Sequence, residues 1–166
     1  MRYLNIEVAL GIAALAILAG KLLHVDLPVS FFIVVPLVTW SVYTLDRIID
    51  TKDPSTAPAT GRHQFHLKYR KLLLTLAALG LLVAATTALL EFPLRYWVAA
   101  VPLGLLTVLH LFLQRTRSKT LSLIKDLNVV LTYTLSAWAI PIIEAQNGGR
   151  LTDNTTVWAS GFAATL

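Results

Sequence analysis

The sequence of 166 residues contains no cysteine, and only 14% of its residues are charged. The absence of cysteine excludes disulfide bonds and thiolate metal sites. The scarcity of charge excludes an ordinary soluble domain, in which about 25% of residues are charged. The sequence also lacks a P-loop, a GxSxG motif, an HExxH motif and a dinucleotide-binding fingerprint. The corresponding nucleotide-binding, serine-hydrolase and zinc-protease classes therefore have no support.

Apolar residues are abundant instead, at 56% of the chain, and they gather in long runs. About 20 consecutive apolar residues suffice to cross the hydrocarbon core of a bilayer as a helix. We expect such helices at 4–23, 27–45, 72–90, 96–113 and 127–143, and a sixth run begins near 157 and continues to 166. The sequence thus predicts an all-α, polytopic transmembrane bundle that forms one domain, 1–166. Because no charge or cap closes the sixth run, we expect this domain to continue beyond residue 166.

The connections between these runs differ sharply in basic residues. Eleven of the 14 Lys and Arg residues fall on one side of the predicted membrane, and Lys21, Arg95 and Arg150 fall on the other. The positive-inside rule places the richer side, with the N-terminus and the 46–71 and 113–126 connections, in the cytoplasm. The net charge of +5 then reflects topology rather than a nucleic-acid partner, since no basic patch interleaved with aromatic residues is present. We expect a multi-pass protein of a plasma or bacterial inner membrane.

Two acidic residues, Asp46 and Asp50, end the second apolar run. The four-residue spacing places both carboxylates on one face of a helix, where their mutual repulsion calls for a cation. Mg²⁺ commonly takes one or two carboxylates together with phosphate oxygens and water. Acidic residues at the border of a spanning helix are costly enough to suggest function. The alternative is that they are solvated at the interface and paired with Arg47 or Lys52.

A basic segment follows the acidic pair, and we expect the whole 46–71 connection to be a loop. The stretch 62–71 contains six groups that can be cationic. Arg62 and His63 are the nearest of them to the acidic pair, and an Arg fork suits phosphate oxygens. The more C-terminal residues of the stretch fit a purely topological role, and a basic cluster can also bind anionic lipid headgroups.

The segment from Tyr43 to Asp50, YTLDRIID, resembles the first aspartate-rich motif of the UbiA superfamily of intramembrane prenyltransferases. That motif reads NDxxDxxxD, and here Val42 and Tyr43 replace its leading Asn-Asp, so that the DxxxD half remains. The resemblance implies a UbiA-like helical bundle and Mg²⁺ as cofactor. It also implies transfer of a prenyl group from an isoprenyl diphosphate to a lipophilic acceptor of the aromatic or quinone type.

The resemblance also suggests roles for individual residues. Asp46 and Asp50 would bind the metal, Arg62 or Lys125 would contact diphosphate oxygens, and Asn128, Tyr133 and Tyr43 would face the substrate cavity. No catalytic residue is assigned. Polar residues in membrane helices often only bridge neighbouring helices, which is the alternative for Asn128 and Tyr133. The rival function is a non-catalytic membrane protein, either a transporter or channel subunit or a pseudo-enzyme.

Three further expectations concern packing. His110, inside the fourth apolar run, is predicted to be a buried, hydrogen-bonded histidine. Gly80 and Gly104 are predicted to permit close approach of helices. Tyr96 lies near a helix end, where an aromatic side chain is typical of the membrane interface.

Overall fold

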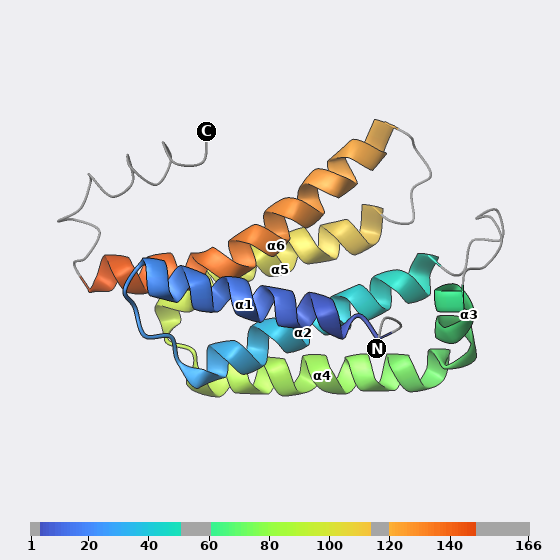
Figure 1. Cartoon of the computed structure of the whole chain (residues 1–166), viewed down its shortest axis with the longest axis horizontal. Coiled ribbons are helices and arrows are strands. Elements are labelled where there is room, and N and C mark those ends of the chain that lie inside the picture. The colour runs from blue at the N-terminus through green and yellow to red at the C-terminus, as the bar shows by residue number, and fades with distance from the viewer. Residues whose placement is uncertain (1–3, 51–60, 114–119, 149–166) are drawn as a thin grey trace.

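The computed structural model describes residues 4–50, 61–113 and 120–148, and at positions 50, 62–63, 120–123 and 125–126 it describes the backbone alone. The described part is helical, without strands. Figure 1 shows its six helices: α1 (Ile6–Leu22), α2 (Val29–Asp50), α3 (Gly61–Lys68), α4 (Arg70–Glu91), α5 (Leu94–Leu113) and α6 (Thr120–Asn147). The prediction of an all-α protein is confirmed for these residues.

Four helical segments are long and apolar enough to cross a membrane: Val29–Ile49, Arg70–Glu91, Leu94–Leu113 and Leu127–Asn147. They correspond to four of the predicted runs, as expected for a multi-pass membrane protein. The run predicted at 4–23 forms α1, whose 17 residues span about 26 Å, slightly less than a hydrocarbon core of about 30 Å. The sixth run, 157–166, lies outside the described residues.

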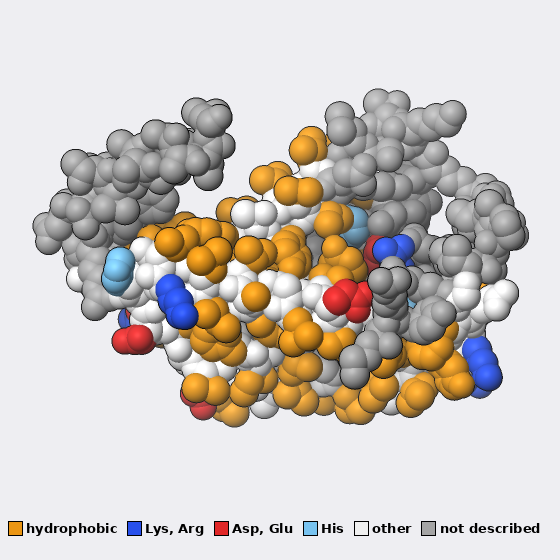
Figure 2. Space-filling view, in the orientation of Figure 1, with side chains coloured by type: hydrophobic (Ala, Val, Ile, Leu, Met, Phe, Trp, Pro, Cys, Tyr) orange, Lys and Arg blue, Asp and Glu red, His pale blue; other side chains and the backbone are white. Residues whose placement is uncertain are grey.

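Apolar side chains cover the long surfaces of these helices. Leu90, Leu94 and Val98 are each more than three-quarters exposed, and Figure 2 shows hydrophobic side chains spread along the bundle, with most charged ones toward its two ends. Contiguous exposed apolar surface of this kind is unfavourable in water. A bilayer is the solvent that suits it.

The segment 61–68 was expected to be a loop, and this prediction is wrong. It forms the short helix α3, which packs against α2 and α4 where α2 ends and α4 begins. His66, one of the potentially cationic groups of the segment, is only 1% exposed. The prediction failed because eight mostly polar residues carry no apolar stripe, and contact with two longer helices stabilises the α3 turns instead.

The helices pack in the order α4, α2, α1, α6, α5, with α1 between α2 and α6. The ends of α2 and α5 and the starts of α4 and α6 lie at the same end of the bundle as α3 (Figure 1). We call this the Asp46 end. The opposite end holds the connection between α1 and α2, the turn between α4 and α5, and the last residues of α6.

The apolar core lies toward the opposite end. Its buried cluster comprises Ala16, Phe31, Val34, Ala84, Ala88, Phe92, Tyr96 and Ile140, which come from five helices and, for Phe92, from the turn between α4 and α5. Beside it, Arg95 Nε and Nη2 donate hydrogen bonds to Glu144 Oε1 at 3.1 and 2.8 Å, and the Tyr96 hydroxyl donates to the same oxygen. Tyr96 is 2% exposed and joins α5 to α6, while its position at the membrane interface stays a prediction.

Gly80 lies at a close contact between α2 and α4. A Cβ atom added at Gly80 would lie 2.8 Å from Ser41 Oγ, and Ser41 is fully buried. The prediction that Gly80 permits close helix approach is therefore confirmed. At Gly104 an added Cβ would meet nothing within 4 Å among the described atoms, so the same prediction is wrong there.

The Gly80 contact gives a stability prediction. Gly80→Ala is expected to lower the stability of the α2–α4 pair by about 1–3 kcal/mol, the usual effect of overpacking. Adding Ser41→Ala removes the clashing oxygen and is expected to restore most of the loss. Thermal unfolding of the purified protein in detergent measures both variants, with Gly104→Ala as the control. A Gly80→Ala variant as stable as the wild type would contradict the packing described for α2 and α4.

Candidate functional site

The acidic pair lies on a continuous helix. Helix α2 runs unbroken from Val29 to Asp50, so Asp46 and Asp50 are one helical turn apart on the same face. The Asp46 side chain is only 15% exposed. The side chain of Asp50 lies outside the described residues, and its backbone ends α2. A carboxylate that is mostly withdrawn from water near the end of a spanning helix needs polar partners.

His110 of α5 is one partner of Asp46. Its Nε2 atom lies 3.4 Å from Asp46 Oδ1, and its side chain is 9% exposed. A protonated imidazole at this distance forms an ion pair with the carboxylate. Both residues make further contacts, so neither depends on the other alone. Because α5 packs chiefly on α6, the pair links α2 to α5 across the bundle.

Asn128 of α6 lies one turn away from this pair. Its Nδ2 atom donates a hydrogen bond to the carbonyl oxygen of Leu106 at 3.0 Å, and Leu106 precedes His110 by four residues on α5. Since residues four apart share a helix face, Asn128 and Asp46 approach the same face of α5. Asn128 is 7% exposed. Its hydrogen bond to α5 is the interhelical bridge that we gave as the alternative to a substrate-binding role.

Tyr133 and Tyr43 approach one another from α6 and α2. The Tyr133 hydroxyl donates to the carbonyl oxygen of Val8 at 3.3 Å. Gly11 gives it space, because a Cβ there would lie 2.8 Å from this hydroxyl. Tyr43 is near enough to Tyr133 for an electrostatic interaction. Tyr43 also precedes Asp46 by three residues, on the same face of α2.

The fold thus brings four of the seven predicted site residues, Tyr43, Asp46, Asn128 and Tyr133, to the inner faces of α2 and α6. The remaining three are Asp50, Arg62 and Lys125, whose side chains lie outside the described residues. Their backbones belong to α2, α3 and α6, all at the Asp46 end (Figure 1).

The role of His110 beside Asp46 was missed from the sequence. Its burial was predicted and is confirmed at 7% exposure, but its partner was not predicted. One signal was available: a pair of acidic residues calls for a compensating cation, and His110 is the one residue between Arg95 and Arg115 that can carry a positive charge. Choosing it would have required knowing that the end of α5 comes beside the end of α2.

The carboxylate of Asp46 is of the kind that a magnesium ion bound together with phosphate would use. Among the described side chains, no three of His, Asp and Glu gather as a metal-binding group. A site built wholly from protein ligands would need such a group, but Mg²⁺ commonly relies on one or two carboxylates, with phosphate and water completing its shell. Asp46 offers one such carboxylate, and its position on α2 sets Asp50 one turn further on.

Comparison of the chain with protein-family models, with curated proteins and with solved structures finds no match. The fold and the arrangement around Asp46 therefore carry the functional argument.

Proposed function

We propose that this chain is a UbiA-like intramembrane prenyltransferase. It transfers a prenyl group from an isoprenyl diphosphate to a lipophilic acceptor of the aromatic or quinone type. The observation that carries the proposal is the placement of Asp46: a carboxylate of a DxxxD motif, 15% exposed, near the end of a helix long and apolar enough to cross a membrane. Placing an ionisable residue in a membrane-spanning helix costs free energy, so such residues are usually functional.

In this proposal the residues at the Asp46 end have different roles in binding the metal ion and the substrates. Asp46 and Asp50 would hold Mg²⁺, which when bound would neutralise the diphosphate and ease its departure. Arg62 and Lys125 contact diphosphate oxygens from α3 and from the start of α6. His110 holds the Asp46 carboxylate in place. Substrate-side contacts come from the phenols of Tyr43 and Tyr133 and the amide of Asn128.

The aromatic rings serve a second purpose. Ionisation of an allylic diphosphate leaves positive charge on the prenyl carbon, and ring faces attract cations. Tyr43 and Tyr133 are the two described rings nearest to the acidic helix end on α2 and α6. The apolar surfaces of the bundle suit a prenyl chain and an acceptor that both arrive from the bilayer.

Equilibrium binding of a farnesyl diphosphate analogue tests this proposal. The wild-type protein in nanodiscs is titrated with the labelled analogue in Mg²⁺ and again in excess EDTA. Saturable binding that requires Mg²⁺ is expected, with farnesol as a competitor control that lacks the diphosphate. Binding that is equal in Mg²⁺ and EDTA would contradict diphosphate chemistry at this site.

The second candidate is a transporter or channel subunit, and the Asp46–His110 pair is the observation that favours it. An acid beside a histidine within membrane helices is typical of proton and ion pathways. Proton flux into vesicles that is lost in Asp46→Asn, with no diphosphate binding by the wild type, would support this candidate over the enzyme.

The proposal also fixes an orientation, with the Asp46 end in the cytoplasm. Because the chain has no cysteine, single cysteines report accessibility without background. Gln64→Cys, exposed on α3, is expected to react with a membrane-impermeant maleimide only from the cytoplasmic side. Glu91→Cys, exposed at the opposite end of the bundle, is expected to react only from outside. The reverse pattern would overturn the orientation.

A further inference from the structure

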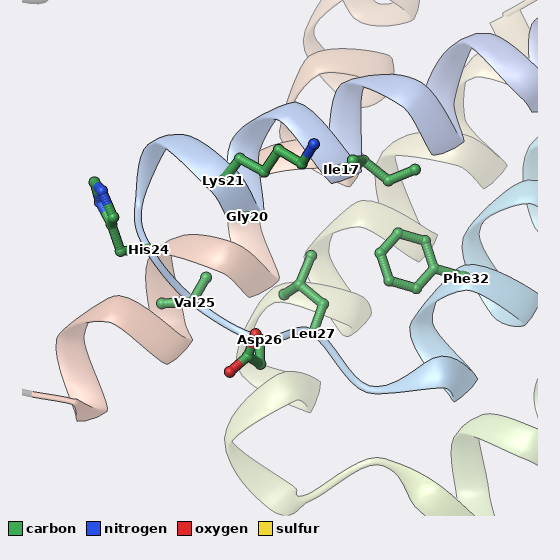
Figure 3. Close-up of a pocket in the computed structure, with 8 residues that line it drawn as sticks. All are labelled: Ile17, Gly20, Lys21, His24, Val25, Asp26, Leu27 and Phe32. Atoms are coloured by element: carbon green, nitrogen blue, oxygen red, sulfur yellow. The ribbon is translucent and has the colours of Figure 1, made fainter.

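A pocket of about 460 Å³ lies at the opposite end of the bundle from Asp46, where α1 turns into α2. Figure 3 shows its lining residues, which come from the end of α1, the connection that follows and the start of α2. The lining comprises Ile17, Gly20, Lys21, His24, Val25, Asp26, Leu27 and Phe32. The lining therefore contains both apolar side chains and charged side chains of both signs.

We expect the pocket to lie at the membrane boundary. The segment of α2 that is long and apolar enough to cross a membrane begins at Val29, so the connection at 23–28 is expected to stand just outside the hydrocarbon. Ile17, which lines the pocket, is 47% exposed, and the nearby Leu22 and Val29 are 55% and 76% exposed. A molecule in the pocket would therefore have its polar part at headgroup depth and its apolar part in the bilayer.

The charged lining consists of one base and one acid that are held apart. Figure 3 shows Lys21 along one side and Asp26 on the other, with Leu27 between them and Phe32 facing from α2, while His24 points away. Among the described residues, the side chains of Lys21 and Asp26 form no ion pair with one another or with a third residue. A ligand with one negative and one positive group complements this arrangement.

The connection between α1 and α2 packs closely against the end of α1. A Cβ atom at Gly20 would lie 3.2 Å from Leu27 Cδ1 and 3.3 Å from the carbonyl oxygen of Val25, so the connection folds closely over the end of α1. The backbone N–H of Val25 donates to the carbonyl oxygen of Gly20 at 2.9 Å. The pocket is therefore formed by packed backbone and not by side chains alone.

We propose that this pocket binds the headgroup of phosphatidylethanolamine. Its phosphate contacts the Lys21 ammonium, its primary ammonium contacts the Asp26 carboxylate, and its acyl chains lie along Ile17 and Phe32. A phosphatidylcholine ammonium carries no N–H to donate to Asp26, and an anionic headgroup such as that of phosphatidylglycerol is repelled by it. The site is independent of the proposed transferase activity.

Native mass spectrometry of the purified full chain tests this site by measuring lipid retention. The protein is equilibrated with equimolar phosphatidylethanolamine, phosphatidylcholine and phosphatidylglycerol of identical acyl chains, and the bound lipid is counted. Phosphatidylethanolamine is expected to dominate. Lys21→Gln is expected to lower its retention about threefold, the size of effect that exposed charge pairs give.

Asp26→Asn separates the two halves of the proposal. It is expected to lower phosphatidylethanolamine retention about threefold while raising phosphatidylglycerol retention, because the repelling carboxylate is gone. Glu91→Gln, an exposed acid at the same end of the bundle, is the matched control and should change neither. Equal retention of the three lipids by the wild type, or an Asp26→Asn variant with unaltered selectivity, would overturn the proposal. The wild-type comparison decides even if a variant folds poorly.

Discussion

Asp46→Ala is expected to weaken Mg²⁺-dependent binding of a farnesyl diphosphate analogue by about 100-fold, equivalent to about 2.7 kcal/mol. The loss follows because one of the two carboxylates that would hold the cation disappears, so the cation would be bound less tightly. Asp50→Ala is expected to give a loss of similar size. The measurement is a binding titration in nanodiscs with Mg²⁺ and with EDTA.

Matched variants make this result specific. Glu91→Ala removes an exposed acid at the other end of the bundle and should leave the affinity unchanged. Asp46→Asn keeps the size of the side chain and removes its charge, so it should resemble Asp46→Ala if the carboxylate is the ligand. Wild-type affinity in both Asp46 variants, with folding intact, would remove this residue from the site.

His110→Ala is expected to weaken the same Mg²⁺-dependent binding by about tenfold, at the lower end of what partners of metal ligands contribute. The physical reason is positional: His110 Nε2 lies 3.4 Å from Asp46 Oδ1, and without the ring this carboxylate loses one of its anchors. The variant is also expected to unfold at a lower temperature, since the link between α2 and α5 is lost.

Phe112→Ala is the control for this variant, because Phe112 lies two residues further along α5 and is 67% exposed. It should lose neither affinity nor much stability. His110→Gln retains a hydrogen-bond donor and should recover part of the affinity. If His110→Ala binds the diphosphate as tightly as the wild type does, then His110 does not position Asp46.

The helices could largely be predicted from the sequence because each one depends on the apolar residues of its own segment. Long apolar runs form helices in a bilayer since every backbone polar group must be satisfied within the segment. The run at 72–90 became α4, Arg70–Glu91, with only small shifts at its ends. Helix α6 starts at Thr120, seven residues before its predicted beginning. Lys125 and Asp126 interrupt the apolar pattern in this stretch, so the predicted run began only at 127.

Contacts between helices could not be predicted in the same way. The neighbours of His110 and Tyr96 depend on which helix faces which, and an apolar run does not encode that. Gly80 and Gly104 show the difference: both are small residues in spanning segments, but only Gly80 faces a packed neighbour, Ser41. At the candidate site, the spacing of Asp46 and Asp50 predicted that they share one helix face. The contact of Asn128 with α5 could not be predicted from the sequence.

Direct observation of a divalent ion at Asp46 is the sharpest test of the proposed function. Mn²⁺ takes the same oxygen ligands as Mg²⁺, and its free concentration can be followed by electron paramagnetic resonance during titration of the protein with a farnesyl diphosphate analogue present. The proposed function predicts saturable uptake of Mn²⁺ by the wild type that Asp46→Asn abolishes and Glu91→Gln preserves. Uptake that is identical in the wild type and Asp46→Asn would contradict it.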